Sequence, residues 1–235
     1  MFKKLIWRFL KSFAQTSFER EYEEAQTFEI TSNLENLLLH AYNNVPYYRD
    51  ILTKGSVVKN GKINLANFGQ VKVLTKEIIR RKASELVSRD YKKRKWFYNT
   101  SGGSTGEPVK LIQDRLSQKW ADATVKFYYE NILGVEETFA KKILLWGARR
   151  DTLGGTTDLG NKIMSTLTNT IYLDSFNMTG ADMRRFVRII NSYKPEIIRG
   201  YTGSLYELCR FVEKKKLSVY TPKVVVSSAE TLHEI

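Results

Sequence analysis

The first third of the chain carries apolar residues at helical spacing. Between residues 18 and 42 they recur three and four positions apart, which predicts one amphipathic helix that faces a core. Residues 43–46, Asn-Asn-Val-Pro, end this helix, because the residue before a proline disfavours helical geometry. A polar loop is expected at residues 54–62, and Thr75 is the expected N-cap of a second helix. The buried stripe of that second helix is expected to contain Ile78, Ile79, Ala83 and Leu86.

The middle of the chain alternates strand and helix patterns. A short aromatic strand at residues 96–98 and a second strand at residues 108–112 enclose seven small residues, which predicts a hairpin with an enlarged tip. Residues 116–133 have helical spacing, and residues 142–146 are typical of a buried strand. A loop rich in glycine and threonine is expected at residues 147–161.

The last third has the clearest pattern. A strand at residues 169–173 precedes Thr179 and Asp182, which form a capping-box arrangement ahead of an amphipathic helix. Pro195 closes that helix.

A strand, a helix and another strand then follow at residues 196–199, 204–215 and 223–227. This spacing predicts a crossover with parallel strands, and therefore an α/β fold with mixed sheets flanked by helices. Ligands gather beyond the carboxyl ends of the strands in open sheets of this kind. We therefore expect a ligand near residues 200–201 and 227–230.

The composition is that of an ordinary globular chain: 42% of the 235 residues are hydrophobic and 27% are charged. No apolar run reaches the roughly 18 residues that cross a bilayer, so neither a membrane span nor a signal peptide is expected. The single cysteine, Cys209, repeats with Leu205, Leu208 and Val212 at helical spacing, which favours a packing role over a nucleophile. One cysteine forms no internal disulfide, which agrees with a cytoplasmic location.

The charge balance is strongly basic. Lys and Arg number 38 against 25 Asp and Glu, and the net charge of +13 attracts nucleotides, nucleic acid or anionic lipid alike. Residues 1–13 form a basic amphipathic pattern that either docks on the fold itself or makes peripheral contact with an anionic membrane. The cluster at residues 92–95 either gathers phosphates or forms a solvated turn.

The hairpin tip is the strongest candidate for chemistry. Residues 100–106 contain three glycines and four hydroxyl residues in one connection between strands. Glycines allow the backbone to approach an anion closely, so successive N–H groups converge on it, while hydroxyl groups donate further hydrogen bonds. Composition alone does not separate a polyphosphate site from a flexible polar tip.

Two familiar signatures overlap these residues and are disfavoured. A Walker loop needs Gly-Lys-Ser/Thr ahead of a helix, whereas Gly106 is followed by Glu107-Pro108 and a strand. Residues 102–106 fit the G-x-S-x-G elbow of serine hydrolases, but that elbow leads from a strand into a helix and needs a histidine base. The two histidines, His40 and His233, do not suit that role.

Residues 100–108 resemble the phosphate-binding signature of adenylate-forming enzymes, Thr-Ser-Gly-Gly/Ser-Thr-Gly-x-Pro. The flanking segments are similar to phenylacetate-coenzyme A ligases and their capsular polysaccharide (CapK-like) relatives, and they cover nearly the whole chain. They occupy residues 40–49, 73–80, 197–205 and 227–232. The resemblance implies the amino-terminal portion of the adenylate-forming fold, with a mainly helical lead-in at residues 1–90 and a nucleotide-binding part at residues 91–235.

The resemblance also implies a reaction in two steps. A small-molecule carboxylate attacks the α-phosphate of ATP, pyrophosphate leaves, and coenzyme A or another acceptor then takes the acyl group; magnesium is expected. Ala229 and Glu230 would line the adenine and acyl pocket. The ATP phosphates would be held by Thr100, Ser101, Gly102, Gly103, Ser104, Thr105 and Gly106.

From the sequence we assign no catalytic residue and no metal-binding residue. Many relatives outside this branch have a lysine directly after the proline of the motif, whereas Val109 here separates Pro108 from Lys110. That shift turns Lys110 to the opposite face of a strand. Trp146 and Tyr201, at strand ends, either wall an acyl pocket or pack in the core.

The sequence stops at Ile235, ahead of the family's Tyr-Gly-x-Thr-Glu-like segment. It also lacks the aspartate that binds ribose and the mobile carboxyl-terminal domain with its catalytic lysine. An incomplete adenylation domain, weakly active or inactive alone, is therefore expected. The alternative is a nucleotide-binding remnant, or half of a split enzyme, that acts as an interaction module with a separate carboxyl-terminal polypeptide. No nucleic acid partner is expected.

Overall fold

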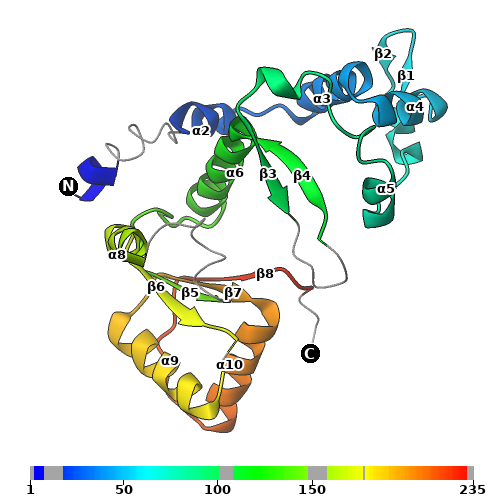
Figure 1. Cartoon of the computed structure of the whole chain (residues 1–235). Coiled ribbons are helices and arrows are strands. Elements are labelled where there is room, and N and C mark those ends of the chain that lie inside the picture. The colour runs from blue at the N-terminus through cyan, green and yellow to red at the C-terminus, as the bar shows by residue number, and fades with distance from the viewer. Residues whose placement is uncertain (1–2, 8–17, 101–107, 148–157, 177, 232–235) are drawn as a thin grey trace. The chain divides into compact units, whose positions relative to one another are not determined.

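A computed structural model describes residues 3–7, 18–100, 108–147, 158–176 and 178–231 (Figure 1). The chain divides into two compact units. The hairpin unit contains residues 17–124, and the sheet unit contains residues 1–16 and 125–235. The division at residue 90 that the resemblance implies stays a prediction.

Three helical segments of the hairpin unit, which begin at residues 30, 65 and 76, have a capping side chain at the preceding residue. One helix was expected over residues 18–42, but that prediction is wrong, because the chain breaks into two helices. The Glu29 carboxylate accepts hydrogen bonds from the N–H groups of Thr31 and Ser32, which starts a new helix. The helical segments are α2 (Glu19–Gln26), α3 (Ile30–Asn44), α4 (Pro46–Lys54), η1 (Leu65–Gln70), α5 (Lys76–Arg81) and η2 (Tyr91–Lys93).

A small core joins α3 and α4 to a two-stranded hairpin. The strands are β1 (Val58–Lys59) and β2 (Lys62–Ile63), so the expected loop at residues 54–62 contains a short sheet. Asn60 and Gly61, with φ of 51° and 72°, make the turn. The buried residues of this core are Leu38, Leu52, Val57 and Val58.

The predicted cap at Thr75 is confirmed, and the predicted length of its helix is wrong. The Thr75 hydroxyl accepts a hydrogen bond from the N–H of Ile78 at 3.3 Å. The helix α5 ends at Arg81, so Ala83 and Leu86 lie beyond it. The Lys82 N–H still bonds the Ile78 carbonyl and closes the last turn.

The predicted large hairpin is confirmed. Strands β3 (Trp96–Thr100) and β4 (Lys110–Asp114) pair antiparallel, with Trp96 opposite Asp114 and Thr100 opposite Lys110. Its tip, residues 101–107, lies outside the described residues. The helix α6 (Arg115–Phe127) follows, and its last turn leads into η3 (Tyr128–Ile132), a π-helical turn, in place of one helix to residue 133.

The sheet unit is built on four parallel strands in the order β6-β5-β7-β8. The parallel pairing expected for the last crossover is confirmed, and so is the α/β fold class. The helix α8 begins at Asp158, three residues before the expected end of the loop at residue 161. The strands are β5 (Lys142–Trp146), β6 (Thr170–Asp174), β7 (Ile197–Tyr201) and β8 (Val224–Ser228); the helices are α8 (Asp158–Leu167), α9 (Gly180–Tyr193) and α10 (Thr202–Lys214).

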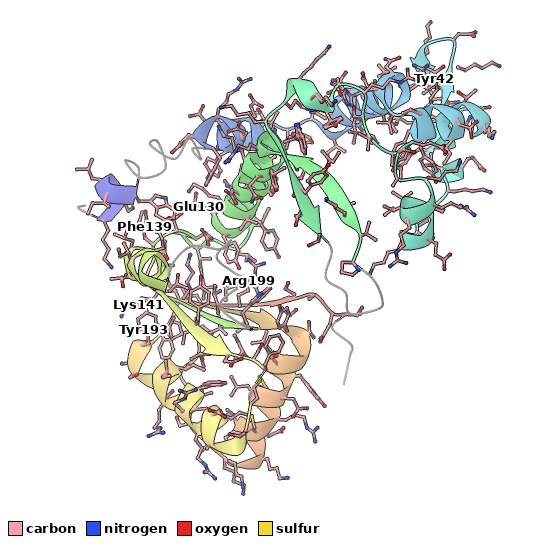
Figure 2. The ribbon with its side chains drawn as sticks, in the orientation of Figure 1. Tyr42, Glu130, Phe139, Lys141, Tyr193 and Arg199 are labelled. Atoms are coloured by element: carbon pink, nitrogen blue, oxygen red, sulfur yellow. The ribbon has the colours of Figure 1, made fainter. Side chains whose placement is uncertain are left out.

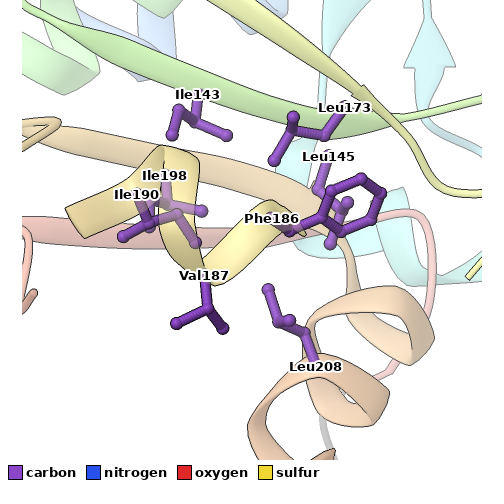
Figure 3. Close-up of a cluster of buried hydrophobic side chains, with 8 residues drawn as sticks. All are labelled: Ile143, Leu145, Leu173, Phe186, Val187, Ile190, Ile198 and Leu208. Atoms are coloured by element: carbon purple, nitrogen blue, oxygen red, sulfur yellow. The ribbon is translucent and has the colours of Figure 1, made fainter. Parts of the chain in front are cut away.

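Helices α9 and α10 cover one face of this sheet and form the main core with it (Figures 1 and 3). The capping box that starts α9 is confirmed, since the Asp182 N–H donates to the Thr179 hydroxyl at 3.3 Å. A Cβ at Gly200 would lie 3.0 Å from the Leu145 side chain and carbonyl, so β7 approaches β5 too closely for a larger residue. The core contains Ile143, Leu145, Leu173, Phe186, Val187, Ile190, Ile198 and Leu208.

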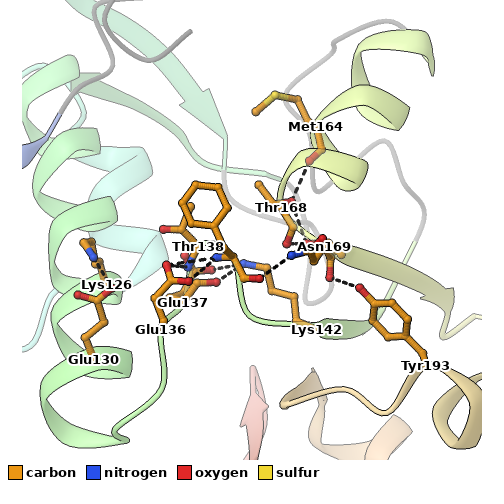
Figure 4. A network of polar contacts seen from close by, with 12 residues as sticks. Lys126, Glu130, Glu136, Glu137, Thr138, Lys142, Met164, Thr168, Asn169 and Tyr193 are labelled. Carbon is orange, nitrogen blue, oxygen red and sulfur yellow. Dashed lines mark hydrogen bonds and ion pairs between the residues drawn. The ribbon is translucent and has the colours of Figure 1, made fainter. Parts of the chain in front are cut away.

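The amino-terminal edge of the sheet is fastened by polar contacts (Figure 4). The Lys142 ammonium, which is buried, pairs with Glu137 at 2.8 Å. The Asn169 side chain donates to the Phe139 carbonyl at 2.6 Å, and the Tyr193 hydroxyl donates to the Asn169 carbonyl at 2.6 Å. These bonds join the segments before β5 and β6 to the end of α9.

The amino-terminal residues 3–7 are helical and dock on the sheet unit. The Lys3 ammonium donates to the Thr166 carbonyl at 2.9 Å, and the Trp7 ring lies edge-on to Phe139 at 6.2 Å. Docking on the fold is thus found for these residues, and membrane contact of residues 1–13 stays a prediction. In the part of the chain that the structure describes, none of the helices combines the length and the apolar character needed to span a bilayer.

The main core predicts a clear contrast between two identical substitutions. Ile190 is 2% exposed in α9, whereas Ile163 is 50% exposed in α8. Ile190→Ala should lower the free energy of unfolding by about 2–5 kcal/mol, because it leaves a cavity. Ile163→Ala should change it by less than about 0.5 kcal/mol. Urea unfolding followed by circular dichroism measures both, and equal losses would contradict the assigned core.

Candidate functional site

The carboxyl edge of the parallel sheet gathers aromatic and polar residues, as its sequence predicts. Trp146 ends β5 and Tyr201 ends the neighbouring strand β7. Their rings stack with centroids 4.2 Å apart and planes inclined by 28°. Because β5 and β7 are parallel neighbours, their last residues lie side by side, and the two rings form one stacked aromatic pair at this edge.

The turn after β8 folds back onto the start of α10. The Glu230 carboxylate accepts a hydrogen bond from the Gly203 N–H at 2.7 Å. Thr202, which is 8% exposed, donates its hydroxyl to the Glu230 carbonyl at 3.1 Å. Ala229 makes the turn with φ of 74°. Segments 200–203 and 228–230 are therefore joined at this edge, as expected from the topology.

Glu230 acts as a helix cap supplied from a distant part of the chain. The residue at the N-cap of α10, Tyr201, makes no capping bond with its side chain, and Glu230 supplies the missing acceptor. Its negative charge also lies at the positive end of the helix dipole. A Cβ at Gly203 would lie 3.0 Å from the Glu230 carboxylate, so this approach favours glycine.

This cap affects where phosphates can bind. The N-terminus of a helix commonly binds anions, but the first turn of α10 already holds a carboxylate. A phosphate there would be repelled by Glu230, so α10 is a poor phosphate site. The proposed contacts of Ala229 and Glu230 with adenine and the acyl group stay a prediction.

Arg199 is a charged residue at this site that our sequence reasoning missed. It lies in β7, and its guanidinium carbon is 5.4 Å from the centroid of the Trp146 ring (Figure 2). Its Nε is buried and has no hydrogen-bond partner within the described part of the chain. Burial raises the pKa of the nearby Tyr129 hydroxyl, while Arg199 acts in the opposite direction. The available signal was one arginine within the apolar run Ile-Ile-Arg-Gly-Tyr.

The predicted phosphate residues are described only at their first position. Thr100 ends β3, is exposed, and its N–H donates to the Asn99 side chain at 2.8 Å. The remaining positions lie outside the described residues; they are Ser101, Gly102, Gly103, Ser104, Thr105 and Gly106.

The base of this hairpin is fixed by charged and polar pairs. Arg94 bridges Asp90 at 3.0 Å and Asp114 at 3.2 Å, so this member of the basic cluster has a structural role. Lys92 and Lys93 of the same cluster are exposed. The Lys110 ammonium lies 3.8 Å from the centroid of the Tyr98 ring.

A hollow of about 500 Å³ lies beside the hairpin in the same unit. Its wall is mainly apolar and aromatic, with charged groups at its margin. The residues that give it this character include Ile79, Leu86, Tyr91, Trp96, Tyr98 and Lys110. No local sequence pattern indicates this hollow, because its walls come from segments that are distant along the chain.

Two further side chains have clear surroundings. Cys209 is exposed, so its predicted packing role is wrong: Leu208 faces the sheet, and the next position of α10 turns away from it.

His40 lies in α3 with its Nε2 3.9 Å from the Asp90 carboxylate. Among the described residues, no three His, Cys, Asp or Glu side chains form a group that could hold a metal ion.

Comparison with known proteins gives one distant curated relative. Protein CapK of Staphylococcus aureus is 22% identical over 217 residues, which are 88% of this chain and 45% of CapK. This homology confirms the resemblance to CapK-like proteins, and the chain spans about half the length of this relative. No protein-family model matches.

Solved structures that align with the chain include 2-hydroxyisobutyryl-CoA ligase. Its open conformation, in complex with 2-HIB-AMP and CoA, gives a TM-score of 0.49 at 16% identity, over 79% of this chain and 43% of the ligase. Its postadenylation state with R3-HIB-AMP gives 0.48 at 15% identity, over 79% and 38% of the two chains.

The cap on α10 predicts a local effect of one substitution. Glu230→Ala should lower stability by about 0.5–2 kcal/mol and speed amide exchange in the first turn of α10, because Gly203 loses its acceptor. Glu230→Gln keeps an acceptor and should cost only about 0.3–1 kcal/mol. Glu207→Ala, later in the same helix, is the matched control. Unchanged exchange at Gly203 in Glu230→Ala would rule out the cap.

Proposed function

We propose that this chain binds ATP through residues 100–106 and activates a carboxylate as an acyl-adenylate. The substrate carboxylate attacks the α-phosphorus of ATP, the bond to the bridging oxygen breaks, and pyrophosphate leaves. The acyl group then passes to the thiol of coenzyme A or to another acceptor, and AMP is released. The observation that carries the proposal is the continuous signature of residues 100–108 on a confirmed hairpin.

The hairpin provides a firm base for such a loop. Its ladder extends to the pair Thr100 and Lys110; the signature begins at Thr100 and ends two residues before Lys110. The Asn99 and Gln113 side chains add a cross-strand hydrogen bond of 2.9 Å near the tip. At the other end of the hairpin, the Arg94 pairs hold β4. Phosphate oxygens would receive hydrogen bonds from N–H and hydroxyl groups that are held at the end of two anchored strands.

The sheet unit supplies features suited to the acyl substrate. The stacked Trp146 and Tyr201 rings offer an apolar contact at the edge where ligands of such sheets gather. Magnesium, when bound, would offset the negative charge of the phosphates. The CapK-like resemblance supports an extension of the proposal to capsular or surface polysaccharide synthesis in the cytoplasm.

A second candidate function is that of an interaction module, which keeps the fold of an adenylating domain but does not form an adenylate. The chain spans 45% of CapK, and β8 has one neighbouring strand within the described sheet. Val225 on β8 is 57% exposed. An edge strand with an exposed apolar side chain can accept another strand, which a separate carboxyl-terminal polypeptide would supply.

The ATP site is tested by calorimetry. The triple variant Gly103→Val, Ser104→Ala and Thr105→Ala should weaken binding of ATP and magnesium at least about tenfold, because hydroxyl donors and close backbone approach are lost. Thr124→Ala, which removes a hydroxyl from the exposed face of α6, is the control and should bind normally. Equal affinity of the triple variant and the control would remove the loop from the proposal.

Isotope exchange separates the two candidate functions. If the chain forms an adenylate, labelled pyrophosphate should enter ATP only when a carboxylate substrate is present. An interaction module should bind ATP without exchange, since the reaction does not proceed to pyrophosphate release. Exchange that appears only after a carboxyl-terminal partner is added would favour a split enzyme.

A further inference from the structure

The position of Arg199 in β7 requires a physical explanation. Its cross-strand neighbours are Leu144 on β5 and Val226 on β8, so apolar residues flank the charge on both sides. Arg199 is half-buried, but its Nε is fully buried, and a buried donor without an acceptor is costly. The structure should therefore contain an acceptor for Arg199, or a ligand should provide one.

The described neighbours of Arg199 provide no negative charge. Trp146 contributes the face of its ring at 5.4 Å, and Tyr129 contributes a hydroxyl. The carboxylates of Glu130 and Glu137, on the segment that contains Tyr129, pair with Lys126 and Lys142. Within the described residues, no carboxylate forms an ion pair with Arg199 and its Nε has no partner. Among the residues that the structure describes, the cation thus has no carboxylate counter-ion.

The depth of Arg199 distinguishes it from the residues at the sheet edge. It lies two residues before Tyr201, which ends β7, and two residues of a strand span about 7 Å. Trp146 and Tyr201 lie at the edge itself. The reacting carboxylate of a substrate belongs at the edge, where ligands of parallel sheets bind. A group that reaches Arg199 would be the far end of the same substrate.

We propose that Arg199 determines substrate specificity by binding a second acidic group on the carboxylate that is activated. The inference rests on the proposed function and names the substrate class as short dicarboxylates. A planar guanidinium presents paired N–H donors that match the two oxygens of a carboxylate. The carbon chain between the two acidic groups would run along one side of the stacked Trp146 and Tyr201 rings. The matching monocarboxylates leave the guanidinium unpaired and bind more weakly.

The test compares ligands that differ only in the second acidic group. Succinate and adipate are measured against butyrate and hexanoate by calorimetry, with and without ATP and magnesium. The unsubstituted chain should bind each dicarboxylate at least about tenfold more tightly than its matched monocarboxylate, the equivalent of one charge-assisted hydrogen bond. No preference for dicarboxylates in the unsubstituted chain overturns the proposal, whatever the behaviour of any variant.

Two variants assign the preference to Arg199. Arg199→Met keeps the length of the side chain and should lose the preference while its ATP affinity stays the same. Arg199→Lys keeps the charge but loses the paired donors, so it should retain part of the preference for dicarboxylates. A preference that survives in Arg199→Met would refute the role of this residue. Circular dichroism confirms the fold of each variant.

The outcomes separate this inference from the proposed function. Tight ATP binding with no preference for dicarboxylates would refute the inference alone. If the chain does not bind ATP but still shows a dicarboxylate preference that depends on Arg199, the adenylating function is refuted. The proposed role of Arg199 in substrate specificity then remains. Trp146→Phe provides an independent readout, since binding next to Trp146 should change tryptophan fluorescence only when that ring is present.

Discussion

The parallel pairing of β7 between β5 and β8 is the constraint on which the candidate site depends. Because the three strands run in the same direction, their carboxyl ends share one edge, and residues as distant as Trp146, Tyr201 and Ser228 end there. Gly200 permits the close approach of β7 to β5 and α10. A wider spacing at this point would separate the stacked rings and move the start of α10 away from Glu230.

The negative and positive side chains at this edge have different surroundings. The positive end of α10 is neutralised by Glu230, which makes that helix a poor place for a phosphate. Arg199 remains as a cation without a carboxylate partner among the described residues. In the proposed function, Arg199 binds the acyl substrate and the phosphates bind elsewhere. This agrees with a division of roles in which the loop that follows Thr100 in the hairpin unit binds ATP and the sheet unit recognises the acyl group.

The distant homology to CapK and the contacts around the hairpin support the same proposal from independent directions. The homology covers 88% of the chain at 22% identity, and it carries no information on single contacts. The structure adds that Arg94 and the pair Asn99 and Gln113 fix the hairpin below the signature. Most charged residues that first suggested phosphate attraction near the hairpin are exposed, while Arg94 serves the fold.

The sequence alone determined the features that depend on near neighbours: the hairpin, the parallel crossover and the caps at Thr75 and Thr179. The hairpin and the caps are encoded within a few residues, and the crossover follows from the order and spacing of strand, helix and strand along the chain. Tertiary structure decided the exposure of Cys209, the burial of an Arg199 Nε that has no partner among the described residues, and the cap that Glu230 gives to α10. Each of these depends on what another strand or helix brings into contact, and no local pattern specifies a partner that lies tens of residues away.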